Sequence, residues 1–257
     1  MRAATIARMI DNLAAYHFVA IDAPDVVAAW LRGLAEAGDL RGTVLVAPEG
    51  INLFLAGAVG AIDTLIDAVR SDARFATLQV KRSRSEAVPF ERLKVKVKPE
   101  IISFRNAEAM PLAAPARAPD VAPVDLARWI RKGHDDAGKR LVLLDTRNRE
   151  EFGYGTFADA LTLPIDNFTE LPAALVPHRE ALRDATVISF CTGGIRCEKA
   201  ALWMRASGMD NVLQLDGGIL GYFEQVGGLG YDGRCFVFDA RVALDPDLRP
   251  LQDGAAA

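Results

Sequence analysis

The sequence predicts an α/β protein built from two domains: a small α+β domain, then a doubly wound domain with a mostly parallel sheet. Three observations support this prediction. Apolar segments in the first half of the chain follow the order strand, helix, strand, strand, helix, strand. The second half alternates short strands with helices, and its strand Leu141–Leu144 is fully apolar, which is typical of a parallel sheet covered on both faces. The length of 257 residues accommodates two domains.

Composition narrows the class of protein. With 51% hydrophobic and 25% charged residues, the chain can bury a sizeable core. The net charge of −4 gives no overall attraction for polyanions. No apolar run reaches the ~20 residues of a membrane-spanning helix, and the N-terminus lacks the pattern of a secretory signal. Three cysteines do not indicate a disulfide framework, so we expect a cytoplasmic protein with reduced thiols and no membrane partner.

The first domain is expected over residues 1–108. Its strands are rich in aromatic and β-branched residues, and its helices repeat apolar residues at helical spacing. In chain order we expect a strand over Tyr16–Ile21, a helix from Ala23 that ends at Gly38, strands over Arg41–Ala47 and Ile51–Ala56, a helix over Val59–Val69 and a strand over Leu78–Arg82. This order is the ferredoxin-like arrangement.

Two segments are expected to lead out of this domain. Leu93–Lys98 alternates apolar and basic residues, so on a strand Lys94, Lys96 and Lys98 would share one face. We expect this strand to be an extension of the first domain. Residues 109–123 are expected to be a linker, because prolines are interleaved with alanines there.

Positive charge is concentrated between Arg74 and Arg105, where nine basic residues face three acidic ones. A local excess of this kind can bind a phosphate backbone even on an acidic protein. It is also typical of a solvated strand face, and the residues alone leave both interpretations open. Phe90 and Phe104 lie in the same stretch, where they could stack on bases or pack in a core.

The second domain is expected over residues 124–230, followed by a C-terminal extension over 231–257. Strands that alternate with helices indicate its mostly parallel sheet. We expect a helix through Trp129 and Ile130, strands over Leu141–Leu144, Leu161–Pro164, Thr186–Phe190 and Val212–Leu215, helical turns within Phe168–Leu182, and helices over Glu198–Ser207 and Ile219–Gln225.

Cys191 directly follows a central strand, at the edge where sites form in open α/β sheets. It begins the loop Cys191-Thr192-Gly193-Gly194-Ile195-Arg196. The glycines let backbone N–H groups turn inward, the next helix directs its N-terminus at the loop, and Arg196 adds a cation. All three effects favour a thiolate, so the pKa of Cys191 should fall below the ordinary value of about 8.5. The alternative is a buried, inert cysteine.

The spacing of this loop separates two chemistries. Tyrosine-phosphatase loops place an arginine after five intervening residues, whereas Arg196 follows Cys191 after four. The phosphatase position belongs to Cys197, which cannot clamp a phosphoryl group with two hydrogen bonds. The sequence therefore disfavours a phosphatase and favours the smaller cradle of sulfur-transfer chemistry.

Several segments carry a resemblance to known proteins. Asp145–Phe152, the Cys191 loop and Asp216–Gly218 together resemble a rhodanese domain. Longer matches resemble the rhodanese-containing tRNA uridine(34) hydroxylase family: Phe190–Ala200, Gly42–Asn52, Pro89–Lys96 and Gly233–Asp239. The resemblance implies oxygen-dependent hydroxylation of the wobble uridine of certain tRNAs to 5-hydroxyuridine. It also implies tRNA as partner, molecular oxygen as co-substrate and Cys191 as the key residue.

The resemblance assigns expected roles to other residues. A tRNA substrate makes seven basic residues candidate RNA contacts: Lys81, Arg82, Arg84, Arg92, Lys94, Lys96 and Lys98. We expect Asp145 and Arg147 to support the Cys191 loop through an ion pair. Cys197 either resolves an oxidised Cys191 as a disulfide or packs inward at a helix start. Thr156 stands where rhodaneses usually have histidine, in a segment expected only to pack.

The same residues bear on other functions and on cofactors. A plain sulfurtransferase would carry a persulfide on Cys191 and move sulfur from thiosulfate to a thiol. A non-catalytic RNA-binding scaffold is disfavoured by the intact Cys191 and Arg196. No flavin or nicotinamide motif is evident, and no metal site is inferred from Cys191, Cys197 and Cys235. The sequence does not indicate the tRNA species or the oligomeric state.

Overall fold

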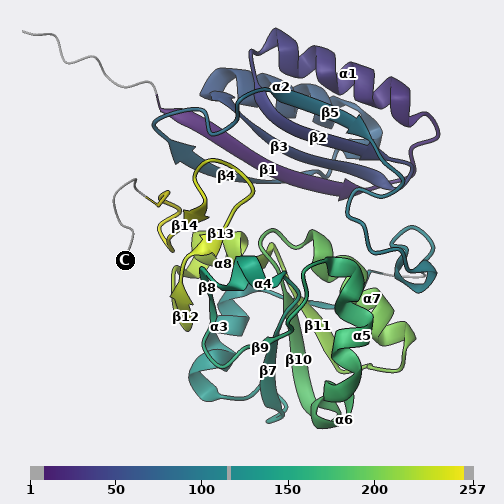
Figure 1. The fold of residues 1–257 in the computed structure, drawn as a ribbon, viewed down its shortest axis with the longest axis vertical. Coiled ribbons are helices and arrows are strands. Elements are labelled where there is room, and N and C mark those ends of the chain that lie inside the picture. The colour runs from purple at the N-terminus through teal and green to yellow at the C-terminus, as the bar shows by residue number, and fades with distance from the viewer. Residues whose placement is uncertain (1–8, 115–116, 252–257) are drawn as a thin grey trace, which may run out of the picture. The chain divides into compact units, whose positions relative to one another are not determined.

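The computed structural model describes residues 9–114 and 117–251, and the chain divides into two compact units between Ile101 and Ile102 (Figure 1). The first unit contains β1 (Ile10–Phe18), α1 (Pro24–Ala37), β2 (Arg41–Ala47), β3 (Gly50–Ala58), α2 (Val59–Ser71), a 3-10 turn (Ala73–Phe75), β4 (Gln79–Ser85) and β5 (Leu93–Val97). Its five-stranded sheet has the order β4-β1-β3-β2-β5. The predicted order of strands and helices is confirmed, and α1 and α2 lie on one face of the sheet.

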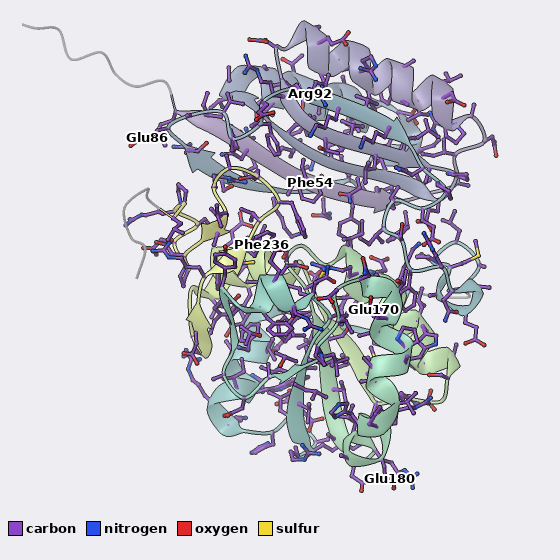
Figure 2. The ribbon with its side chains drawn as sticks, in the orientation of Figure 1. Phe54, Glu86, Arg92, Glu170, Glu180 and Phe236 are labelled. Atoms are coloured by element: carbon purple, nitrogen blue, oxygen red, sulfur yellow. The ribbon has the colours of Figure 1, made fainter. Side chains whose placement is uncertain are left out.

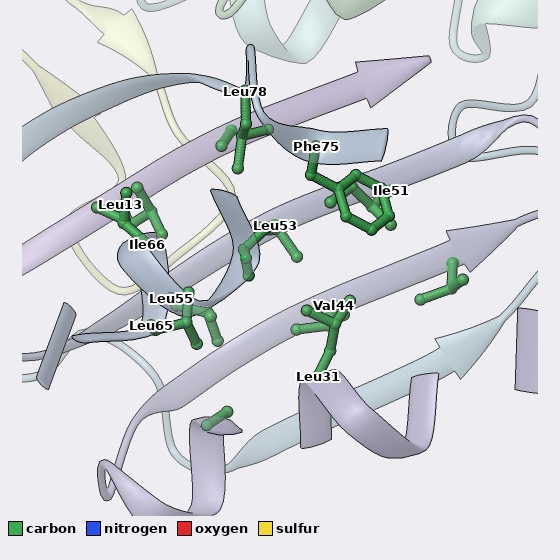
Figure 3. Packing of buried hydrophobic residues seen from close by; sticks show 14 of the residues in the cluster. Leu13, Leu31, Val44, Ile51, Leu53, Leu55, Leu65, Ile66, Phe75 and Leu78 are labelled. Atoms are coloured by element: carbon green, nitrogen blue, oxygen red, sulfur yellow. The ribbon is translucent and has the colours of Figure 1, made fainter. Parts of the chain in front are cut away.

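Strand register decides which residues form the core of the first unit. Leu13 of β1 lies opposite Leu55 of β3, and Leu53 lies opposite Val44 of β2. These side chains share the face covered by the helices, where Leu31 of α1 meets them (Figure 3). Burying each such aliphatic side chain contributes roughly 1.5–3 kcal/mol, so this cluster is the main source of stability for the unit.

Two strands of the first unit differ from the prediction. The first strand covers Ile10–Phe18 instead of Tyr16–Ile21, because its residues pair continuously with β3. The N–H groups of Val19 and Ile21 instead donate to carbonyls in the turn that follows β2. Leu93–Val97 is not an extension leading out of the domain: it pairs in parallel with β2 as an edge strand. Leu93 and Val95 pack against the core, which holds the strand in place.

The second unit contains a parallel five-stranded sheet with the order β6-β11-β10-β7-β9. The strands of this sheet are β6 (Asp120–Val121), β7 (Arg140–Asp145), β9 (Leu161–Thr162), β10 (Ala185–Phe190) and β11 (Val212–Leu215). Two separate two-stranded sheets pair β8 (Gly155–Phe157) with β12 (Tyr231–Gly233) and β13 (Cys235–Phe236) with β14 (Ala243–Leu244). Its α-helices are α3 (Pro123–Lys132), α4 (Arg149–Phe152), α5 (Leu171–Leu175), α6 (Arg179–Leu182), α7 (Ile195–Ala206) and α8 (Gly218–Val226), with 3-10 turns at Ala107–Ala109, Phe168–Glu170 and Val176–His178.

Side chains along β10 point alternately to the two faces of the sheet, which shows why this unit is doubly wound. Ala185 and Val187 point into a core shared with α7, whereas Ile188 and Phe190 point into a second core shared with α8. All six residues of the strand are buried. Helices therefore cover both faces of the sheet, as predicted.

The ends of the second unit differ from the expected boundaries. Phe104, Ala109 and Ala118 lie in the same core as α7, and Val121 belongs to β6 at the sheet edge. Both ends of the expected linker are therefore packed into the second unit. The expected C-terminal extension is likewise integrated, because β12 pairs with β8. Among the described residues, no helix has the length and apolar character needed to cross a bilayer.

Candidate active site

Cys191 lies at the carboxyl end of β10, in the middle of the parallel sheet, and its side chain is fully buried. The backbone N–H of Gly194 donates a hydrogen bond to its sulfur at 3.2 Å. Helix α7 begins at Ile195, three residues before the predicted start, because Gly194 turns the chain with φ = 100°. Arg196 and Cys197 therefore lie in the first helical turn, whose N–H groups have no partner within the helix.

The thiol of Cys191 is surrounded by groups that stabilise its ionised form. Burial by itself raises the pKa of this thiol. A hydrogen bond with the Cys197 side chain, the charge of Arg196 and the backbone N–H groups of both residues outweigh that effect. The net result is a pKa of Cys191 well below the ordinary range, in the direction predicted from the sequence.

Cys197 is the neighbour that stays protonated. Its side chain is fully buried, and burial together with the adjacent Cys191 thiolate raises its pKa well above the usual range. A neutral thiol at this position can donate a hydrogen bond to the Cys191 sulfur. The Cys197 sulfur also lies 3.8 Å from the hydroxyl oxygen of Thr146. Cys197 is thus both packed inward and adjacent to Cys191.

Arg196 is held by Glu151, a residue that the sequence interpretation did not single out. Two hydrogen bonds join them, Nη1 to Oε2 at 2.6 Å and Nη2 to Oε1 at 2.5 Å. Both side chains are almost completely buried. Burial raises the pKa of Glu151, but the hydrogen bonds and charge of Arg196 outweigh that effect. The net pKa of Glu151 is lowered, so the carboxylate stays ionised. The capping box formed by Asn148 and Glu151 at α4 was the available sequence signal.

Asp145 and Arg147 form the predicted ion pair, at 2.6 Å between Nη2 and Oδ2 and with both side chains fully buried. The same Nη2 donates to the carbonyl of Gly155, and the Thr156 hydroxyl donates to the Asp145 carboxylate at 2.8 Å. Asp145 lies opposite Phe190 in the sheet, directly beside the start of the Cys191 loop. Thr156 therefore does more than pack, because it completes the support of this carboxylate.

The turn Asp216–Gly218 holds the other side of the loop. The N–H groups of Ile219 and Leu220 donate to the carbonyls of Cys191 and Thr192 at 2.9 and 3.0 Å. Gly218 has φ = 63°, and a Cβ placed there would lie 2.6 Å from the Cys191 carbonyl oxygen. At Gly193, by contrast, a Cβ would meet nothing within 4 Å. The loop is thus tightly packed against Gly218 of the neighbouring turn and has open space beside its own Gly193.

Cys235 belongs to the surroundings of the site and differs from Cys191 in its ionisation. Its side chain is fully buried, and burial raises the pKa of its thiol to about 12. The next residue contacts the loop, because the Thr192 hydroxyl donates to the carbonyl of Phe236 at 3.4 Å. Within the described ranges, no group of three or more His, Cys, Asp or Glu side chains could hold a metal ion.

The seven predicted RNA contacts do not form one cluster, because β4 and β5 are the two opposite edges of their sheet. Arg82 faces the helices, where it is ion-paired with Asp11 and with Asp63. Lys94 and Lys96 are exposed and point to the face of the sheet without helices. Lys81 points to the same face and is half-buried. The remaining candidates are all exposed: Arg84, Arg92 and Lys98. Phe104 is a core residue, and Phe90 is half-buried.

Comparison with known proteins covers both units. Residues 10–101 match the UPF0176 acylphosphatase like domain, and residues 125–225 match the rhodanese-like domain. A tRNA uridine(34) hydroxylase of Xanthomonas euvesicatoria pv. vesicatoria is 65% identical over 245 residues, which cover 95% of this chain and 98% of the relative. This chain belongs to the tRNA uridine(34) hydroxylase family. A family member from Xylella fastidiosa is 62% identical, with 95% of each chain covered.

Solved structures resemble parts of this family member. The yeast protein Ygr203w, described as a protein tyrosine phosphatase of the rhodanese family, is 17% identical with a TM-score of 0.38, covering 47% of this chain and 95% of that one. The reduced CoADR-RHD of Bacillus anthracis is 20% identical with a TM-score of 0.38, covering 69% of this chain and 28% of that one.

Proposed function

We propose that this chain hydroxylates carbon 5 of uridine 34 in tRNA, with Cys191 as the reactive group and molecular oxygen as co-substrate. The observation that carries the proposal is a buried cysteine with a lowered pKa in a chain that matches tRNA uridine(34) hydroxylases over nearly its whole length. Because its substrate is tRNA, we place the enzyme in the cytoplasm.

In this proposal each residue of the site has a separate task. Cys191 supplies a nucleophilic sulfur, and Gly194 together with the first turn of α7 stabilises its negative charge. Arg196 adds a fixed positive charge, and Glu151 keeps that charge in place. Asp145, Arg147 and Thr156 hold the neighbouring strand end, so the thiolate is presented in one geometry.

Hydroxylation by molecular oxygen requires two electrons in addition to the uridine. When one atom of molecular oxygen enters the C–H bond of uridine, the other atom is reduced to water by two electrons and two protons. These electrons come from a reductant outside the chain. Dioxygen labelled with oxygen-18 should therefore label the new hydroxyl group. Label that arrives instead from oxygen-18 water would contradict molecular oxygen as the source.

The deciding experiment removes the reactive sulfur. A strain that lacks this gene and other routes to 5-hydroxyuridine is complemented with the wild type, with Cys191→Ser or with Cys235→Ala, and its tRNA nucleosides are measured by mass spectrometry. We expect 5-hydroxyuridine with the wild type and with Cys235→Ala, and none with Cys191→Ser. Modification at wild-type level in Cys191→Ser cells would refute the role of this cysteine.

We further propose that basic residues of the first unit bind the tRNA backbone. Among the seven candidates, Lys94 and Lys96 have the best support, because they are exposed and share one face of their sheet edge. Arg82 has the weakest support, since two carboxylates already neutralise its charge. Contacts of this kind make affinity depend on salt concentration.

A sulfurtransferase is the second candidate, favoured by the hydrogen bond from Gly194 to the sulfur and by the rhodanese-like match. The same cradle would stabilise a persulfide on Cys191 formed from thiosulfate. Cyanide-dependent release of thiocyanate by the purified protein, without any change in tRNA nucleosides on gene deletion, would favour this function over hydroxylation.

A further inference from the structure

Exposed aromatic side chains gather at one place in the second unit. Tyr154 and Phe238 are 40% and 61% exposed, and no other Phe, Tyr or Trp side chain in the described part of the chain is exposed to this extent. Both rings contact the same third ring. The centroid of Phe236 lies 5.4 Å from that of Tyr154 and 5.0 Å from that of Phe238. The three rings therefore form one continuous aromatic surface.

This surface adjoins the loop of the reactive cysteine. The carbonyl of Phe236 accepts the hydrogen bond from Thr192, the residue that follows Cys191. Tyr154 follows α4, the helix that carries Glu151 and so fixes Arg196. Figure 2 shows Phe236 on the C-terminal segment, and β13 is in contact with α4. A molecule that reacts at Cys191 would thus have the aromatic surface beside it.

The exposed ring of Phe238 is carried by an ordered turn. Val237 donates to the carbonyl of Val242 at 2.9 Å and continues the pairing of β13 with β14. Inside the turn, Arg241 donates from Nε and Nη2 to the Asp239 carboxylate at 2.8 and 2.6 Å. An apolar ring that is held in place while exposed loses little conformational entropy when it binds a ligand.

Nearby acidic side chains are paired with arginines. Asp239 is ion-paired with Arg241, and Asp245 lies 3.8 Å from Arg234. Because these carboxylates are compensated, they repel a phosphate backbone less than isolated carboxylates would.

We propose that Tyr154, Phe236 and Phe238 form a stacking platform for a base that neighbours the reacting uridine. The inference rests on the proposed function, which supplies a single-stranded tRNA loop as the ligand. A uridine that enters a protein site leaves the stack of its own loop, and its neighbours then lose a stacking partner. Aromatic side chains replace such partners, with little dependence on base identity.

The test measures binding and turnover separately. Binding of an anticodon stem-loop RNA with uridine at position 34 is measured by fluorescence anisotropy in the Cys191→Ser background. The variants are Phe238→Ala, Tyr154→Ala and Phe238→Trp, and the matched control is Val176→Ala, whose side chain is also 61% exposed in the second unit. We expect about ten-fold weaker binding for each alanine variant of the platform, from the usual strength of base–aromatic stacking. Phe238→Trp and Val176→Ala should stay within about two-fold of the parent protein.

Turnover and oligomeric state distinguish the other outcomes. In the active protein, Phe238→Ala should raise KM while kcat changes less. If Phe238→Ala binds RNA as tightly as Val176→Ala, the platform is refuted, while the wild type still forms 5-hydroxyuridine and the proposed function stands. If the wild type binds the RNA but forms no 5-hydroxyuridine, the proposed function fails instead. If Phe238→Ala changes only the sedimentation of the protein, the aromatic surface binds a second copy and the proposal is wrong.

Discussion

Glu151 and Arg196 form a buried ion pair with two short hydrogen bonds, although 45 positions separate them in the sequence. The pair joins α4 to the first turn of α7, and so fixes the cation beside Cys191. Arg196 is therefore a positioned charge and not a mobile side chain.

Breaking this pair should destabilise the protein. Glu151→Ala leaves the Arg196 guanidinium buried without its carboxylate, which typically costs about 3–5 kcal/mol. Urea unfolding followed by circular dichroism measures the loss. Glu150→Ala, next to it and exposed, is the control and should change stability by less than about 0.5 kcal/mol. Equal stability of the two variants would show that the pair does not hold the loop.

The reactivity of Cys191 should depend on pH in a defined direction. Its lowered pKa means that the thiolate fraction rises with pH and reaches its plateau below the ordinary titration range near 8.5. Iodoacetamide labelling against pH, with peptide mass spectrometry, should give a midpoint below that of a free thiol. In Arg196→Met the midpoint should move upward, because a stabilising charge is lost. A midpoint at the ordinary value in the wild type would contradict a stabilised thiolate.

Two glycines of the same loop region should respond differently to alanine. Gly218→Ala places a Cβ 2.6 Å from the Cys191 carbonyl oxygen at positive φ, so we expect a loss of roughly 1–3 kcal/mol and of activity. Gly193→Ala meets open space and should leave the unfolding free energy nearly unchanged. Thermal unfolding of both variants checks this, and equal destabilisation would contradict the tight packing at Gly218.

The basic residues of the first unit should separate into binding and structural groups. Lys94→Ala with Lys96→Ala should weaken tRNA binding and reduce the slope of log K against log salt by about 1.4–1.8, from two lost phosphate contacts. Lys132→Ala with Lys139→Ala removes the same charge from exposed positions in the second unit and should leave the slope unchanged. Arg82→Ala should instead lower stability, since Asp11 is left buried without its partner. A wild-type salt slope for the Lys94 and Lys96 variant would refute their contact with RNA.

Local patterns made much of this structure predictable. The strand before Cys191 is mostly apolar and fully buried, and short, mostly apolar strands of this kind indicate a central parallel strand. The regular helical spacing over Val59–Val69 likewise specified α2, because its apolar face alone indicates which side is buried. Misplaced boundaries arose where pairing overrides local preference, as in β1, whose Ala14 and Ala15 are poor strand formers.

The sequence by itself determined the two-unit α/β architecture, the position of Cys191 after a buried strand, and the neighbouring Gly193, Gly194 and Arg196. These features depend on residues close together in the chain, where periodicity and spacing carry the information. Only the tertiary structure decided that Glu151 holds Arg196, that Gly218 closes on the loop, and that one basic stretch is split between two sheet edges. The reason is physical: strand register and long-range packing bring together residues that are distant in the chain, and the local sequence around each residue does not identify its partner.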